Sequence, residues 1–212
     1  MPDPGQIVIL NGVPRAGKSS IVAVIQETFD GPWMNLGVDV FSRFVTPPRY
    51  QPGMGLRPGG ERPEIEAHLP AFCAALYDSV AAHSRQGLPV VVDVGHHDAY
   101  SAPLDTLADA ARRLAGLPTL FVGVRCPIDV IMQRRSEAQT DERGRYLASG
   151  PGDTIPPTVL RWQEEVHRDL TYDLGVDTSV LTAAQCAEAI RQALEHPPSP
   201  SAFERLALRA PS

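Results

Sequence analysis

The sequence predicts an α/β fold in which helices cover both faces of a parallel β-sheet. Short apolar segments alternate with helical segments along the chain, which is typical of consecutive βαβ units. Two of the segments, residues 89–94 and 119–125, are continuous apolar runs, as expected for parallel strands buried on both faces. No internal repeat or domain boundary interrupts the pattern. We therefore expect a three-layer sandwich that forms one domain over residues 1–195.

A glycine-rich turn follows the first expected strand, residues 6–11. Residues 12–19 have the G-x-x-x-x-G-K-[ST] spacing of a phosphate-binding loop (P-loop), and a helical segment with an apolar stripe extends from Lys18 to about Phe29. Backbone N–H groups and the helix N-terminus attract an anion there, Lys18 can reach its β- and γ-phosphates, and Ser19 can offer its hydroxyl to Mg²⁺. The sequence thus predicts a nucleoside triphosphate site formed by Gly12, Val13, Pro14, Arg15, Ala16, Gly17, Lys18, Ser19 and Ser20.

The remaining elements are expected in alternation along the chain. Strands are predicted at residues 33–38 and just before 177–179, and helices at 40–44, 64–86, 101–114, from 127, from 156 and at 182–194. Pro70 is expected to kink its helix. Two stretches without periodicity, 46–63 and 139–155, are interpreted as a substrate-side loop and a lid-like loop. Residues 196–212 form a Pro/Ser-rich tail that we expect to be partly ordered.

Composition narrows the class of protein. The net charge of −6 and the absence of like-charge blocks argue against a nucleic-acid-binding surface. The apolar runs are too short to cross a membrane, and the N-terminus does not resemble a secretory signal. Cys73, Cys126 and Cys186 have no metal-like spacing, and each is interpreted as a small core residue. Because scattered thiols in odd number suit a reducing compartment, a cytoplasmic protein is expected.

Two aspartates follow expected strands and are candidates for phosphoryl-transfer chemistry. Asp93 ends the apolar run 89–94, where it can bind the metal directly or through water, or instead cap a neighbouring loop or helix. Asp39 follows the second expected strand. If that strand neighbours the first, the Asp39 carboxylate faces the γ-phosphate and can act as a general base. The alternative is an N-cap for the helix expected from Val40.

Five arginines are candidates for neutralising charge that develops during transfer. They lie at the end of one expected helix, within the lid-like loop and on the following helix: Arg134, Arg135, Arg143, Arg145 and Arg161. The alternative for the first group is a solvated basic helix end that complements the helix dipole. The sequence does not choose among them.

Histidines and aromatic residues give weaker indications. His96, His97 and Asp98 follow the third strand. The two adjacent histidines point in different directions, and no further ligand has suitable spacing to bind a metal with them. A loop that lines the substrate site is therefore favoured over a metal site. His167 is interpreted as a surface or partly buried histidine. Aromatic side chains that could line an apolar substrate pocket, or belong to the core, are Trp33, Phe41, Phe44, Trp162 and Tyr172.

Several stretches together resemble the chloramphenicol phosphotransferase family. They are Ile9-Leu10-Asn11-Gly12 leading into Ala16-Gly17-Lys18-Ser19-Ser20-Ile21-Val22, then Pro32-Trp33, Leu36-Gly37-Val38-Asp39, the strand ending at Asp93, Phe121-Val122-Gly123-Val124-Arg125-Cys126, Arg134, Val166-His167, Tyr172-Asp173 and Val176-Asp177-Thr178. The P-loop is common to many families, whereas the Leu-Gly-Val-Asp and Val-Gly-Val-Arg-Cys stretches are more specific. The resemblance covers nearly the whole chain up to about Leu194.

The resemblance implies a nucleotide-kinase-like fold with a five-stranded parallel core and ATP–Mg²⁺-dependent phosphorylation of a primary hydroxyl of chloramphenicol, an antibiotic-resistance activity. It implies that Asp39 is the general base, that Gly17, Lys18 and Ser19 bind phosphate, and that Arg134 is the loop-side arginine. Pro14-Arg15 departs from the small residues expected in the loop, so Arg15 is a candidate for a further phosphate or lid contact. Residues 94–98 and 47–63 match poorly, and because these loops are expected to shape the acceptor pocket, the acceptor is chloramphenicol or another hydroxylated small molecule.

Two other functions stay open at this point. A metabolic kinase of the shikimate or gluconate type would need basic residues for an anionic acceptor, and Arg49, Arg57 and Arg62 in the substrate-side loop could supply them. A nucleotide-dependent switch without a small acceptor is disfavoured because the Asn-Lys-x-Asp guanine-reading motif is absent. The sequence leaves a homo-oligomer and the choice between ATP and GTP open.

Overall fold

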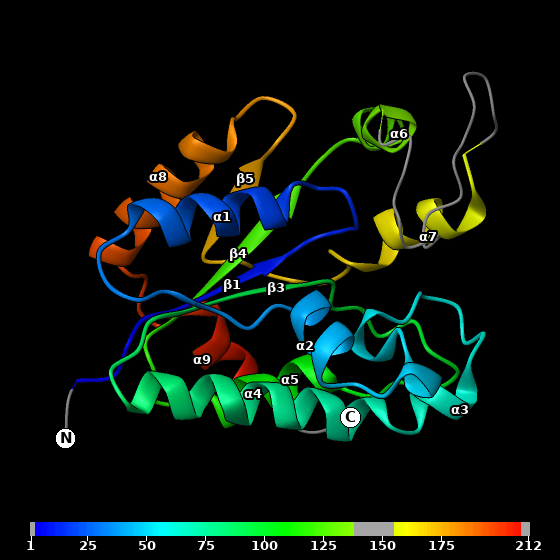
Figure 1. The fold of residues 1–212 in the computed structure, drawn as a ribbon, viewed down its shortest axis with the longest axis horizontal. Helices are drawn as coiled ribbons and strands as arrows, with labels where there is room; N and C mark the ends of the chain where they lie inside the picture. Colours follow the sequence, from blue (N-terminus) through cyan, green and yellow to red (C-terminus); the bar gives the residue numbers. More distant parts are fainter. Residues whose placement is uncertain (1–2, 138–154, 209–212) are drawn as a thin grey trace.

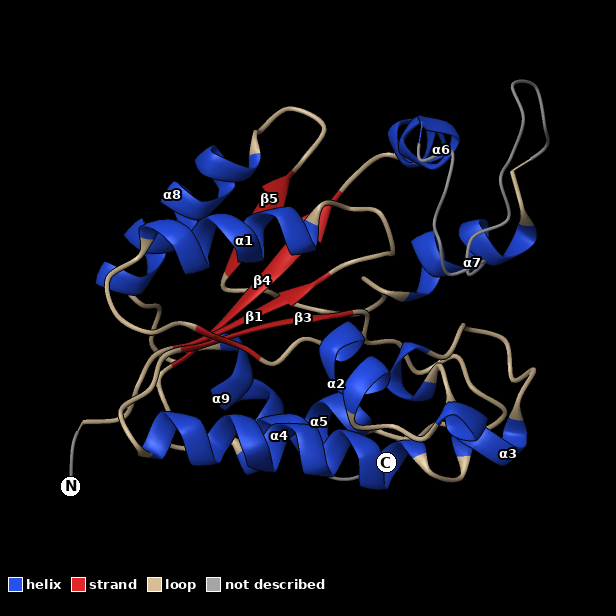
Figure 2. Ribbon diagram, in the orientation of Figure 1, coloured by secondary structure: helices blue, strands red, loops and turns tan. Residues whose placement is uncertain are grey.

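A computed structural model describes residues 3–137 and 155–208 and contains a five-stranded sheet in which every pairing is parallel. The strand order is β2-β3-β1-β4-β5 (Figures 1 and 2). The strands are β1 (Ile7–Asn11), β2 (Met34–Asn35), β3 (Val90–Val94), β4 (Thr119–Arg125) and β5 (Leu174–Asp177). The predicted parallel α/β sandwich is confirmed.

Helices form one layer on each face of the sheet (Figure 1). One layer contains α1 (Lys18–Thr28) and α8 (Ala183–Glu195), and the other contains α4 (Leu69–Arg85), α5 (Thr106–Arg113) and α9 (Ala202–Ala207). Successive side chains of β1 point to opposite faces, so Val8 and Leu10 belong to the core under α1, whereas Ile7 and Ile9 belong to the core over α4. Burial of both faces explains why the strand sequences are continuously apolar.

The segment after β2 differs from the sequence prediction. The second strand is confined to two residues and pairs with β3, not with β1. Helix α2 (Val38–Phe44) begins two residues earlier than expected, with Gly37 as its N-cap. Asp39 therefore lies within the first helical turn and is not the N-cap. An acidic side chain in a first turn also complements the helix dipole.

Two other helical regions differ from their predicted bounds. The expected helix 64–86 is divided into α3 (Pro63–Glu66) and α4, and Pro70 lies in the first turn of α4, where its missing N–H does not disturb the helix. Helix α5 begins at Thr106, not after Ser101. The Ser101 hydroxyl instead donates a hydrogen bond to the buried carboxylate of Glu66.

Elements at the carboxyl edge of the sheet flank the P-loop. Helix α6 (Ile128–Glu137) follows β4, and α7 (Pro157–Glu165) precedes β5 (Figure 2). The substrate-side loop contains two short 3₁₀ turns, η1 (Pro48–Tyr50) and η2 (Gly53–Gly55). The expected lid-like loop lies outside the described residues except for Ile155. In the described part of the chain, no helix is long and apolar enough to cross a membrane.

The tail beyond residue 195 contains a helix that the sequence did not predict. The Asp173 carboxylate accepts a hydrogen bond of 2.6 Å from the backbone N–H of Ala202, at the start of α9. Ser201 and Glu204 form a capping box there. Phe203 is buried with its ring centroid 5.0 Å from that of Phe121 on β4. The tail therefore completes one helical layer.

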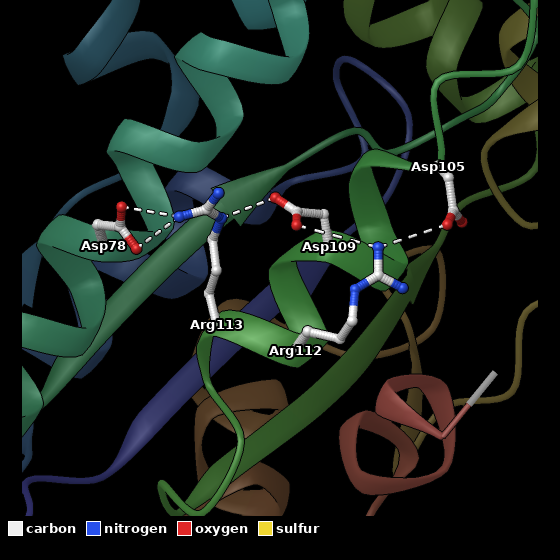
Figure 3. Close-up of polar contacts among 5 residues, drawn as sticks. All are labelled: Asp78, Asp105, Asp109, Arg112 and Arg113. Atoms are coloured by element: carbon white, nitrogen blue, oxygen red, sulfur yellow. Dashed lines mark hydrogen bonds and ion pairs between the residues drawn. The ribbon is translucent and has the colours of Figure 1, made fainter. Parts of the chain in front are cut away.

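Arg113 connects helices α4 and α5 of the same layer (Figure 3). Nη1 of Arg113 lies 2.8 Å from both carboxylate oxygens of Asp78 on α4, and its Nε donates to Asp109 on α5 at 2.7 Å. Arg112 lies 3.5 Å from Asp105. Because these groups are partly exposed, each pair contributes only about 0–1 kcal/mol to stability.

Candidate active site

The P-loop, residues 12–19, connects β1 to α1. At Gly12 a Cβ would lie 2.4 Å from the carbonyl oxygen of Val124, so only glycine allows the loop to approach β4 this closely. Gly17 has φ +88°, a conformation that disfavours other residues. The ammonium of Lys18 donates to the carbonyl oxygens of Gly12 at 2.7 Å and Val13 at 2.9 Å, which folds its side chain across the loop.

Two carboxylates flank the start of α1. Asp93 accepts a 2.9 Å hydrogen bond from the Ser19 hydroxyl, and the pairing of β3 with β1 explains why these residues meet. Burial lowers the pKa of Lys18, whereas the negative charges of Asp93 and Asp39 act in the opposite direction. The Lys18 ammonium therefore interacts electrostatically with two carboxylates, that of Asp93 on β3 and that of Asp39 on α2.

A cavity of about 980 Å³ lies over the P-loop. We call it the larger cavity. Its walls come from the P-loop and the start of α1, from α2 and η2, from the end of β3, and from α6, α7 and the segment after β5: Gly12, Pro14, Arg15, Gly17, Lys18, Ser19, Ser20, Ile21, Val38, Asp39, Met54, Gly55, Asp93, Val94, Gly95, Arg134, Trp162 and residues 178–183. Of the predicted nucleotide-site residues, Val13 and Ala16 are buried beneath this surface.

Arg134 is held against the P-loop by several contacts. Its guanidinium donates to the Thr178 carbonyl at 2.6 Å, to the Thr178 hydroxyl at 3.1 Å and to the Arg15 carbonyl at 3.3 Å. It also contacts the buried thiol of Cys126 at 3.4 Å. Arg134 therefore connects α6, the loop and the residue after β5. Arg15 itself has φ +69° and lines the cavity.

A second cavity, of about 520 Å³, opens beside the first, and we call it the smaller cavity. The two cavities share Pro14, Asp39, Gly55 and Trp162. The smaller one has apolar walls from Val13, Leu56, Ile131 and Val159, and polar or charged ones that include Ser42, Gln51, Arg57, Glu61, Arg62, Arg135, Thr158 and Gln163. Asp39 is the carboxylate common to both cavities.

The comparisons with known proteins agree with this geometry. A family model described as chloramphenicol phosphotransferase-like protein matches residues 5–195. The chain belongs to this family. Proteins named as O-phosphotransferases in two strains of Mycobacterium tuberculosis are 26% identical to it over 223 residues, covering 99% of this chain and 90% of theirs. Family membership and fold together make the chain a kinase-like phosphotransferase.

Solved structures of small-molecule kinases share the fold. The Mycobacterium tuberculosis APS kinase in complex with AMPPNP and APS has a TM-score of 0.63 and 16% identity, covering 92% of this chain and 99% of that one. A sugar kinase from a Janibacter species has a TM-score of 0.57 and 18% identity, with coverage of 93% and 99%. Shikimate kinase from Acinetobacter baumannii in complex with shikimate has a TM-score of 0.55 and 13% identity, with coverage of 92% and 95%.

The oxygen ligands of the site suit a hard cation. Mg²⁺ binds through one or two protein oxygens, substrate phosphates and water, and the Ser19 hydroxyl and Asp93 carboxylate offer this chemistry.

Among the described residues no group of three or more His, Cys, Asp or Glu side chains is placed to hold a metal. His96 and His97 form no metal centre with Asp98. His96 lies 2.5 Å from the Tyr77 hydroxyl, and His97 lies 3.0 Å from the Leu56 carbonyl.

Of the aromatic residues considered for a substrate pocket, Trp162 alone lines the two cavities. Trp33 packs in the core with its ring centroid 5.4 Å from that of Phe29. Phe41 packs against the core over α4, and the Phe44 side chain is 74% exposed. Tyr172 packs on Phe121. These four residues lie outside the walls of the two cavities, and Trp33, Phe41 and Tyr172 follow the core alternative.

The predicted arginines occupy different places. Arg134 lines the larger cavity, and Arg135 lines the smaller one. Arg161 contacts the Pro58 carbonyl at 3.3 Å and Glu61 at 3.8 Å, and it is absent from both cavity walls. Arg143 and Arg145 lie outside the described residues.

Two residues that build the site, Gly37 and Thr178, were quoted above within the family resemblance but were given no role. Thr178 holds Arg134, and its hydroxyl also donates to the Ala16 carbonyl at 2.8 Å. Gly37 packs directly against Asp93, so that a Cβ there would lie 1.8 Å from the carboxylate oxygen Oδ1. Their positions at the ends of β5 and β2 are a signal, because ligand sites of parallel sheets lie at that edge.

Proposed function

We propose that this chain transfers the γ-phosphate of ATP to a hydroxyl of a small molecule, with chloramphenicol or a related antibiotic as the first acceptor to test. One observation supports it above the others: Asp39 lies on the wall shared by a cavity over the P-loop and a second cavity. The larger cavity suits the triphosphate, and the smaller has the size of a small-molecule site. A carboxylate at their junction has the place that a base between donor and acceptor needs.

In this proposal the acceptor hydroxyl enters the smaller cavity and gives its proton to the Asp39 carboxylate. The acceptor oxygen bonds to the γ-phosphorus as the bond to the bridging oxygen breaks, and ADP leaves with that oxygen. Lys18 and the P-loop N–H groups neutralise charge on the phosphates. Ser19 and Asp93 would hold Mg²⁺, which supplies further charge neutralisation. Arg134 fixes the P-loop against Thr178 and faces the same cavity.

The first experiment measures ADP release from ATP–Mg²⁺ with and without chloramphenicol, followed by mass analysis of the acceptor. Stimulated release and a mono-phosphorylated product would support both reaction and acceptor. Asp39→Asn should retain nucleotide binding and lose transfer by about 10²–10⁴-fold, since a positioned base contributes that much. Transfer by Asp39→Asn near the wild-type rate would exclude Asp39 as the base. Replacing ATP with GTP in the same assay tests the choice of nucleotide.

A second candidate is a kinase for an anionic acceptor, and a specific observation favours it. Of the three loop arginines considered from sequence, Arg57 and Arg62 line the smaller cavity, whereas Arg49 stacks over the Tyr50 ring at 4.8 Å. Arg135 from α6 adds a third guanidinium. Guanidinium groups pair with carboxylates in bidentate geometry, so a hydroxy acid would find partners there.

This candidate is tested with shikimate and gluconate beside chloramphenicol. If the acceptor is anionic, Arg57→Gln should raise the KM for the acid about tenfold or more, because a charge-assisted hydrogen bond contributes about 1.5–3 kcal/mol. Arg49→Gln, in the same loop but outside the cavity wall, should leave that KM unchanged. Phosphorylation of chloramphenicol together with no activity on either acid would reject this candidate.

A further inference from the structure

A buried amide lies directly beneath the P-loop. Asn11 ends β1, immediately precedes Gly12, and is fully buried. Its Oδ1 accepts a 2.7 Å hydrogen bond from the backbone N–H of His96. Its Nδ2 donates to the Val166 carbonyl at 3.0 Å and to the Tyr172 hydroxyl at 2.9 Å. Since the His96 N–H can only donate and the Val166 carbonyl can only accept, one orientation of the amide satisfies all three bonds.

The three partners of Asn11 belong to separate segments. His96 follows β3, Val166 ends α7, and Tyr172 precedes β5. The Tyr172 hydroxyl accepts from Asn11, so its own proton is available for Nδ1 of His167, which lies 2.7 Å away. That arrangement requires an unprotonated Nδ1. Burial lowers the pKa of His167 to about 4, with the charges of Arg125 and Lys18 acting in the same direction, so the ring is neutral at pH 7.

The bonds from Asn11 to His96 and to Val166 lie on either side of Trp162, one of the residues that line both cavities. Gly95 precedes His96, and a Cβ on Gly95 would lie 3.0 Å from the Trp162 ring. On the other side, the Val166 N–H donates to the Trp162 carbonyl at 3.1 Å, in the last turn of α7. Asn11 therefore holds both the segment under the Trp162 ring and the helix end that carries it. Trp162 lines both cavities.

From this geometry we propose that Asn11 is a positioning residue, which keeps the P-loop in register with the Trp162 wall of the acceptor site. The inference rests on the proposed phosphotransferase function for its kinetic consequence, but its structural consequence can be measured without turnover. Displacement of the Trp162 wall would misplace the acceptor hydroxyl relative to Asp39 and the γ-phosphate. Misplacement by about 1 Å can reduce transfer 10²-fold.

Two variants and a control test the proposal. Asn11→Asp keeps the size and one acceptor oxygen but removes the Nδ2 donor. Tyr172→Phe keeps the ring but removes the hydroxyl and with it the bonds to Asn11 and His167. Ser84→Ala is the control, because Ser84 is equally buried and its hydroxyl donates to the Gly5 carbonyl at 2.6 Å, at the other end of β1. All three remove a buried hydrogen bond and should lower the melting temperature.

The distinguishing readout is Trp162 itself. The chain has two tryptophans, Trp33 and Trp162, so the Trp33→Phe background leaves one reporter. We expect Asn11→Asp and Tyr172→Phe to raise acrylamide quenching of Trp162, and Ser84→Ala to leave it unchanged. With chloramphenicol as acceptor, Asn11→Asp should lower kcat/KM per folded molecule about tenfold or more and change the KM for ATP less.

The outcomes separate this inference from the proposed function. Quenching and kcat/KM that match those of Ser84→Ala would show that Asn11 contributes stability alone, and the proposal would be wrong. If Asn11→Asp does not fold, Tyr172→Phe decides by the same comparison. If the wild-type protein phosphorylates no acceptor, the proposed function fails, and Trp162 quenching still decides whether Asn11 positions the wall.

Discussion

A single methyl group at Gly37 should disable the site with little effect on the fold. Gly37 has φ −59° and ψ 158°, which alanine adopts readily, so backbone strain plays no part. The added Cβ would lie 1.8 Å from Oδ1 of Asp93. Because real Cβ atoms almost never approach a heavy atom within 3.0 Å, that oxygen must withdraw by about 1.2 Å. Oδ2 of the same carboxylate accepts the 2.9 Å hydrogen bond from Ser19, so displacing the carboxylate disturbs this bond as well.

The expected loss of activity follows from this displacement of the Asp93 carboxylate. A catalytic group misplaced by about 1 Å can cost about 10²-fold in rate, and Gly37→Ala moves Asp93 while also pushing on the start of α2, which carries Asp39. We expect kcat/KM in the ADP-release assay to fall about 10²-fold. The free energy of unfolding should change by less than about 1.5 kcal/mol, since one short side chain rotates and one partly exposed hydrogen bond is lost.

A matched control is available in β5. Gly175 has no heavy atom within 4 Å of its added Cβ and no positive φ, so Gly175→Ala should leave kcat/KM unchanged. The assay compares both variants with the wild type at saturating ATP–Mg²⁺, and urea denaturation reports stability. If Gly37→Ala retained near wild-type transfer, Asp93 would not need its observed position, and its proposed metal role would be refuted.

Three further predictions concern separate parts of the molecule. Burial, aided by the charge of His97, lowers the pKa of His96 to about 3, so this side chain takes up a proton near pH 6.5 in the unfolded chain but only near pH 3 in the folded one. The free energy of unfolding should therefore fall by about 1.4 kcal/mol per pH unit as the pH drops through that window. His96→Gln should lose this pH-dependent component in urea titrations. Phe203→Ala should lower the free energy of unfolding by about 3–5 kcal/mol, because the buried ring holds α9 on the sheet, and an unchanged urea midpoint would contradict this. Arg134→Lys should raise the KM for ATP about tenfold, because an ammonium cannot reproduce the forked contacts with Thr178, and an unchanged KM would show that Arg134 does not support the nucleotide site.

Much of the fold was predictable because its signals are local. Continuous apolar runs at β3 and β4 indicate strands buried on both faces, and glycine spacing indicates the turn between β1 and α1. Parallel strands expose their carboxyl ends at one edge, so Asp93 could be placed beside the P-loop without coordinates. The family resemblance rested on the same residues and is confirmed.

The errors occurred where local and tertiary preferences differ. Residues 33–38 have the composition of a strand, but β2 lies at the sheet edge and pairs with β3 over two residues, after which the chain turns into α2. The tail contains a short helix that would be marginal in isolation, and its stability comes from Phe203 packed on β4 and the N–H capped by Asp173. Neither contact leaves a sequence pattern, since the partners are far apart in the chain.

The sequence by itself determined the alternation of strands and helices in the α/β core, the P-loop and the candidates Lys18, Ser19 and Asp93, because each depends on periodicity or on spacing within one supersecondary unit. Tertiary structure decided which distant side chains meet. It placed Asp39 at the junction of two cavities, assembled the smaller cavity from the substrate-side loop, α6 and α7, and left Trp33 and Tyr172 outside it. Side-chain proximity between distant segments follows from packing of the whole core, which no local pattern encodes.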